Sequence, residues 1–94
     1  MKSAIQNDVI FRLRKLREAR GYSQAKVAAL LCISSGQIGN IESPKHSHKY
    51  TLAQLETLSE EFNVPIESLF FDPEERHGPI TIKEFIHRII EYQE

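Results

Sequence analysis

The amino-acid sequence predicts an all-α fold. Apolar residues recur at spacings of three and four along most of the chain, and no stretch alternates apolar and polar side chains as a half-buried strand does. Four hydroxyl residues also stand where each can cap a helix, because an apolar residue precedes each one and another follows four positions later. They are Ser23, Ser34, Thr51 and Thr81.

Five helices are expected in residues 1–71, which are long enough for one small domain. Each has apolar residues at helical spacing, as Val9 and Leu13 have in the first. Gly21 can end the first helix in a left-handed cap, and Pro44 ends the third. Pro65 suits the first turn of the fifth. The expected ranges are 7–20, 23–31, 34–43, 51–62 and 65–70.

The composition of residues 72–79 predicts a linker, since two prolines and a glycine stand among charged side chains. The remaining segment, 80–94, predicts an added amphipathic helix over about 82–93 with a wide apolar stripe. The stripe consists of Ile82, Phe85, Ile86, Ile89 and Ile90.

This stripe is too apolar to be left in water, because burying five large side chains is worth on the order of 10 kcal/mol. The C-terminal helix can cover the stripe by folding back onto the first and fifth helices. Alternatively, it can pack against its own copy in a homodimer, for which the linker would give it reach. A different protein partner is the third possibility.

Composition excludes several classes of protein. The longest apolar run, residues 27–33, is far shorter than the roughly 18 residues that suggest a membrane span. The polar N-terminal residues do not resemble a secretory signal, so we expect a cytoplasmic protein. The single cysteine, Cys32, cannot form an internal disulfide, and no Cys-x-x-Cys pair indicates a metal or cofactor site.

The net charge of −1 conceals a strong asymmetry between the two halves of the chain. Residues 1–50 carry nine Lys or Arg and three Asp or Glu, for a net charge of +6. Residues 51–94 carry three and ten, for a net charge of −7. A basic half favours contact with a polyanion, although some of these side chains can simply solvate a helix face.

The most informative segment is 23–43, which predicts a short helix, a tight connection and a second helix with a polar outer face. The segment 16–43 resembles the Cro/phage-repressor helix-turn-helix family, also called the XRE family, in its sequence LREARGYSQAKVAALLCISSGQIGNIES. The later segment 51–70, TLAQLETLSEEFNVPIESLF, is similar to the fourth and fifth helices of that family. The resemblance implies a five-helix repressor-like domain that binds double-stranded DNA.

The resemblance also implies a role for individual residues. Base edges would be contacted by Ser35, Gly36, Gln37 and Asn40. DNA phosphates would be contacted by Gln24, Lys45, His46, Ser47, His48 and Lys49. A structural salt bridge would join Arg17 to Glu42.

Several of these residues have a plainer alternative role. Gln37 can instead close a capping box with Ser34, and Gln24 can be an ordinary solvated residue. His46 and His48 form a poor metal site without a nearby carboxylate or thiol, so no metal is expected.

The expected DNA-contacting region also departs from the family pattern. Cys32 stands where relatives place glycine, and a positive φ there would strain it. Gly36 and Gly39 weaken the helix that would enter DNA. Few long side chains are left there to specify bases, so recognition can depend partly on DNA shape.

The leading functional hypothesis is a sequence-specific regulator that binds a palindromic operator as a dimer. The alternative is a protein-interaction module, or an antitoxin-like protein that binds DNA through its basic half and a protein through its acidic half. Catalysis and a cofactor are not expected, because no nucleophile–base spacing and no phosphate-binding glycine loop is present.

Overall fold

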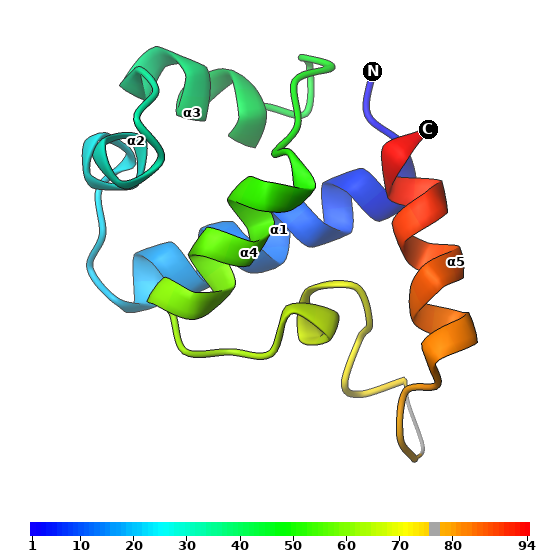
Figure 1. Cartoon of the computed structure of the whole chain (residues 1–94). Helices are drawn as coiled ribbons and strands as arrows, with labels where there is room; N and C mark the ends of the chain where they lie inside the picture. Colours follow the sequence, from blue (N-terminus) through cyan, green and yellow to red (C-terminus); the bar gives the residue numbers. More distant parts are fainter. Residues whose placement is uncertain (76–77) are drawn as a thin grey trace.

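A computed structural model describes residues 1–75 and 78–94 of the chain. Arg76 and His77, which belong to the predicted linker, lie outside the described residues. The described part contains helices and no strand, which confirms the all-α prediction (Figure 1). Its helices are α1 (Ala4–Ala19), α2 (Gln24–Leu31), α3 (Ser35–Glu42), α4 (Leu52–Glu61), the 3₁₀ helix η1 (Ile66–Leu69) and α5 (Ile82–Gln93).

The predicted capping residues begin the helices to which they were assigned. The side chains of Ser23, Ser34, Thr51 and Thr81 each accept a hydrogen bond from the backbone N–H three residues later. Such caps contribute about 1 kcal/mol each, so they fix where these short helices begin.

Two boundaries differ from the sequence prediction. Helix α1 begins at Ala4 rather than near residue 7, because Ser3 and Gln6 form a capping box. The expected fifth helix is a short 3₁₀ turn, and Pro65 precedes it in an extended conformation with ψ 138°. The turn ends when the N–H of Phe70 bonds to the carbonyl of Glu67, three residues back.

The hydrophobic core lies around α1, which crosses the middle of the molecule (Figure 1). Val9 and Leu13 of α1 are buried at the centre, and every other helix contributes to the same cluster. Residues that contribute include Val27, Ile38, Ile41, Leu55, Leu58, Leu69, Phe70 and Tyr92.

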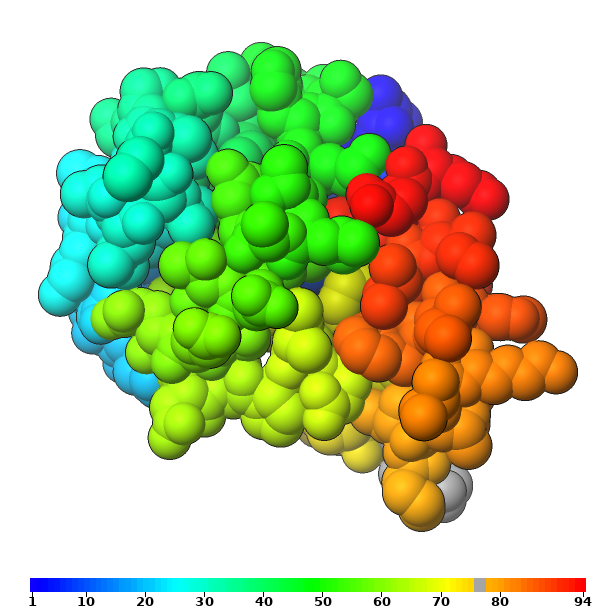
Figure 2. All heavy atoms as spheres, viewed as in Figure 1, coloured from blue at the N-terminus to red at the C-terminus, as the bar shows by residue number. Residues whose placement is uncertain are grey.

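Helix α5 folds back onto the body of the molecule and lies along its side (Figure 2). Phe85 and Ile89 pack against the core, and the ring of Phe70 lies 5.4 Å from that of Phe85 and 5.8 Å from that of Tyr92. Tyr92 is fully buried, although it was not included in the predicted stripe. Phe85 and Ile89 are therefore covered by the body of the same chain, as the fold-back alternative expects.

The rest of the predicted stripe points away from the core. Ile82, Ile86 and Ile90 are 79%, 48% and 52% exposed, respectively. The stripe therefore divides into a buried edge and an exposed edge, which corrects the expectation that one surface covers all five residues. Among the described residues, no helix has both the length and the apolar character needed to cross a membrane.

Candidate nucleic-acid interface

Helices α2 and α3 are joined by a tight turn of three residues, Cys32 to Ser34. Cys32 has φ 57° and ψ 40°, the left-handed conformation that glycine adopts more easily. The N–H of Cys32 bonds to the carbonyl of Ala29, and the N–H of Ile33 bonds to the carbonyl of Ala28. These two bonds form a Schellman motif, which ends α2 and turns the chain toward α3.

The start of α3 is held by a complete capping box. The side-chain oxygen of Ser34 accepts from the N–H of Gln37, and Gln37 Oε1 accepts from the N–H of Ser34 at 2.9 Å. Gln37 is exposed, yet its carbonyl oxygen is already engaged. A bidentate bond to adenine would therefore require this box to open.

The polar face of α3 lies opposite the buried side chains of Ile38 and Ile41. Ser35, Gly36 and Gln37 are exposed, and Asn40 is half-buried. The structure thus brings the four predicted base-contacting residues to one helix.

Neither glycine of α3 is required by its packing against the described residues. A Cβ at Gly36 would meet only the Ser34 hydroxyl at 3.9 Å, and a Cβ at Gly39 would meet Gln24 Oε1 at 3.7 Å. Both distances are ordinary van der Waals contacts. No described residue therefore approaches the backbone of α3 so closely that a glycine is needed at either position.

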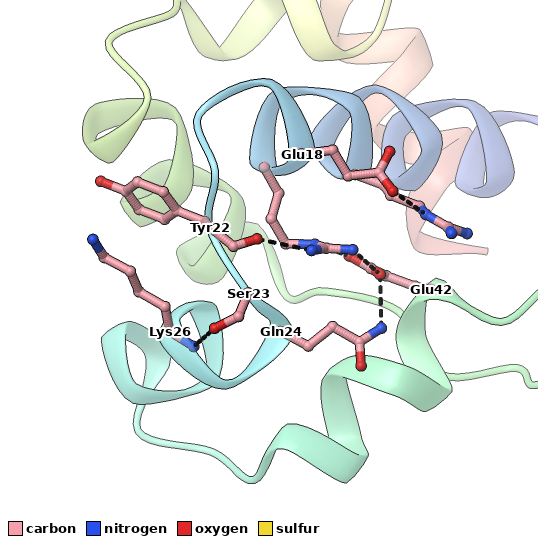
Figure 3. Close-up of polar contacts among 8 residues, drawn as sticks. Glu18, Tyr22, Ser23, Gln24, Lys26 and Glu42 are labelled. Carbon is pink, nitrogen blue, oxygen red and sulfur yellow. Dashed lines mark hydrogen bonds and ion pairs between the residues drawn. The ribbon is translucent and has the colours of Figure 1, made fainter.

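A buried ion pair joins α1 to α3 (Figure 3). Arg17 binds Glu42 through two hydrogen bonds and also donates from Nη1 to the carbonyl of Tyr22 at 2.8 Å. The side chains of Arg17 and Glu42 are only 11% and 4% exposed. The hydrogen bond with Glu42 is the main cause that raises the pKa of Arg17 above its ordinary value.

Gln24 connects α2 to the same ion pair. Its Nε2 donates to Glu42 Oε1 at 3.0 Å, as Figure 3 shows. Because an amide nitrogen carries two N–H groups, one donor of Gln24 is left after this bond. Glu42 thus receives hydrogen bonds from both α1 and α2, and it fixes the position of α3 relative to these helices.

The loop after α3 carries the other predicted phosphate-contacting residues. Lys45, His46, Ser47 and His48 are exposed, and Lys49 is half-buried. The rings of His46 and His48 lie 6.0 Å apart. In residues 1–75 and 78–94, no three His, Cys, Asp or Glu side chains gather where they could hold a metal ion.

One contact to this region was missed by the sequence reasoning. Lys2 is only 7% exposed, and its ammonium donates to the backbone carbonyls of Asn40, Ser43 and His46. Nothing in the spacing of the sequence could have found it, because about 40 residues separate the donor from its acceptors.

Some of the basic residues in the first half of the chain are used inside the molecule. Lys2 and Arg17 have backbone or carboxylate partners, and Arg12 donates from Nη1 to the carbonyl of Leu69 at 2.8 Å. Fewer than nine basic side chains of residues 1–50 are therefore available for direct contact with a phosphate.

Two short helices joined by a tight turn, with the polar face of the second one exposed, define a helix-turn-helix DNA-binding domain. A family profile described as a helix-turn-helix domain matches residues 11–74. The chain therefore belongs to the XRE-type helix-turn-helix family, as its sequence predicted. Residues 1–10 and helix α5 lie outside the matched range.

The fold is also similar to a solved structure, the crystal structure of the hypothetical transcription factor NHTF from Neisseria. The TM-score is 0.62 at 19% sequence identity, and the match covers 77% of this chain and 80% of the other. At this identity the likeness concerns the fold. A search of curated proteins finds no match.

Proposed function

We propose that this protein is a sequence-specific DNA-binding regulator whose helix α3 enters the major groove. The observation that carries the proposal is the exposed N-terminal turn of α3, in a helix whose position is fixed by the buried Arg17–Glu42 ion pair. In helix-turn-helix proteins, the N-terminal residues of the second helix contact base edges. A rigid backing favours such contacts because it lowers the entropy lost on binding.

Base contacts are assigned to α3. The amides of Gln37 and Asn40 lie three residues apart, and an amide has the donor and acceptor that an adenine edge requires. For Gln37 this contact requires the capping box with Ser34 to open, because its carbonyl oxygen accepts from Ser34 in the free protein. Ser35 adds a hydroxyl, and Gly36 lets the backbone approach closely because it has no side chain. With so few long side chains, part of the specificity would come from DNA shape.

Phosphate contacts are assigned to residues on both sides of α3. Gln24 at the start of α2 offers its second N–H, and the loop offers Lys45, His46, Ser47, His48 and Lys49. These contacts would orient the domain on the duplex without carrying sequence information.

A homodimer on a palindromic operator completes the proposal. Ile82, Ile86 and Ile90 lie at i, i+4 and i+8 on one face of α5, and all three are exposed. Burying the same face twice across a twofold axis would remove six isoleucines from water. The axis would also relate two copies of α3 by symmetry, as the two half-sites of a palindrome require.

The proposal is tested by selecting bound duplexes from a random pool and then measuring variants on the preferred site. Gln37→Ala and Asn40→Ala should each cost roughly 1–3 kcal/mol on that site and relax the preference at one or two base pairs. Lys49→Ala should weaken binding to all sequences alike. Uniform losses in all three variants would show that α3 does not contact bases.

A further inference from the structure

We propose that the two ends of the chain position the loop of residues 43–50 for its contact with DNA, through Lys2 at the start of the loop and Tyr92 at its end. This inference rests on the proposed function of that loop. Lys2 and Tyr92 both lie outside the range matched by the family profile, 11–74, whereas the loop lies inside it. The first residues, in blue, lie between the loop and the end of α5, in red (Figures 1 and 2).

Lys2 forms hydrogen bonds both to the end of α3 and to the beginning of the loop. Its ammonium has three N–H groups and three backbone acceptors, which are the carbonyls of Asn40, Ser43 and His46. The distances to Asn40 and His46 are 3.5 and 2.6 Å. Carbonyls at a helix C-terminus lack partners within the helix and favour a nearby cation, so this position suits a lysine.

Tyr92 binds the other end of the loop. Its hydroxyl donates to the carbonyl of Tyr50 at 2.7 Å, and the carbonyl of Tyr92 accepts from Gln6 Nε2 at 2.7 Å. Gln6 belongs to the capping box that begins α1, directly after Lys2. The N-terminal turn of α1 and the last turn of α5 are therefore connected to each other as well as to the loop.

Lys2 is a positioning residue and is not available to contact DNA. It is 7% exposed, and its N–H groups are occupied by carbonyls of the same chain. A lysine that neutralises a phosphate contributes about 0.9 to the salt slope of DNA binding, because it releases a counterion. A lysine that only orients the loop contributes nothing to that slope. This difference separates the two roles by experiment.

The experiment compares Lys2→Met, Tyr92→Phe and Lys45→Met on the selected site at several salt concentrations. Lys45 is the matched control, since it is an exposed lysine of the same loop. Lys2→Met should weaken affinity about tenfold, which corresponds to about 1.4 kcal/mol, and leave the salt slope unchanged. Tyr92→Phe should weaken affinity in the same way by a smaller factor. Lys45→Met should lower the slope by about 0.9 for each bound subunit.

Amide hydrogen exchange of the free protein provides a second readout. In Lys2→Met and Tyr92→Phe, residues 43–50 should exchange faster, while the buried amides of α1 and α4 should keep their protection. This comparison distinguishes a local release of the loop from a general loss of stability. All binding is measured at a temperature at which thermal unfolding shows each variant to be folded.

Each outcome supports or overturns the inference. Unchanged affinity and unchanged exchange in Lys2→Met would refute the positioning role, as would a drop in its salt slope equal to that of Lys45→Met. Wild-type protein that binds no DNA would refute the proposed function. Wild-type binding with unaffected variants would refute only the role of the two chain ends.

Discussion

Arg17 holds Glu42 in a bidentate pair, with Nε 2.8 Å from Oε2 and Nη2 2.9 Å from Oε1. The two residues come from α1 and α3, and both side chains are nearly excluded from water. A pair of this kind contributes little net stability compared with apolar side chains, because both charges lose their hydration. Its effect is to fix the orientation of α3, since two parallel hydrogen bonds tolerate little rotation.

Arg17→Met is expected to destabilise the fold by about 3 kcal/mol, because it leaves the carboxylate of Glu42 buried without its cation. Urea unfolding followed by circular dichroism measures this loss. The matched control is Arg14→Met, which removes an exposed pair with Glu18 at 3.4 Å and should cost at most about 1 kcal/mol. Equal losses in the two variants would show that burial of the Arg17 pair is unimportant.

Cys32→Gly is expected to stabilise the protein by about 1 kcal/mol, because it removes the strain of a side chain at φ 57°. Helices α1 and α4 end in the same hydrogen-bond pattern, with Gly21 and Asn63 at the left-handed position. Asn63→Gly is the control and should have little effect, since asparagine tolerates this conformation. Thermal unfolding of both variants tests the comparison, and a destabilised Cys32→Gly would contradict it.

The helix starts could be predicted from sequence because their causes are local. A hydroxyl residue, the N–H three positions later and an apolar pair around them are all visible in a short window, as at Ser34 and Thr51. At Ser3 only the capping box is present, because the polar residues Lys2 and Asn7 stand where the apolar pair would be, and the sequence therefore predicts a start for the first helix that is too late. At Cys32, the glycine of related proteins raises a positive φ only as a condition, and the structure contains that conformation.

The remaining features depend on contacts between distant segments. Lys2 reaches the loop only after α1 and α3 have packed, and no periodicity encodes that contact. The division of the α5 stripe depends on how the helix lies on Phe70. The engagement of Gln37 in the capping box was foreseen as an alternative, and the structure contains it.

Stability is expected to fall as the pH rises above about 10, because burial raises the pKa of Tyr50 and Tyr92 above that of a free phenol. In that range the unfolded chain releases protons that the folded chain retains, so unfolding becomes more favourable. Tyr92→Phe should lose less stability between about pH 9 and 11 than the wild type. Urea midpoints across this range measure the difference, and identical slopes for the two proteins would contradict the account.

Ile86→Lys is expected to convert the proposed dimer into a folded monomer, because it places a charge at the centre of the exposed face of α5. The control is His87→Lys, which introduces the same residue at the neighbouring exposed position. Light scattering gives the mass of each variant, and circular dichroism verifies the fold. A monomeric wild type, or a dimer that persists in Ile86→Lys, would exclude this face of α5 as the interface.

The salt dependence of binding to random-sequence DNA tests the central claim, that the surface around α3 binds DNA, most directly. Lys45 and Lys49 of each subunit are expected to neutralise phosphates. The slope of log Kd against log salt concentration should therefore be about 2 for one bound subunit and about 4 for a dimer. Fluorescence anisotropy with a labelled duplex at several salt concentrations measures this slope. We expect a slope in that range that decreases in Lys45→Met. A flat salt response, or no binding at low salt, would contradict the assignment of this protein as a DNA-binding regulator.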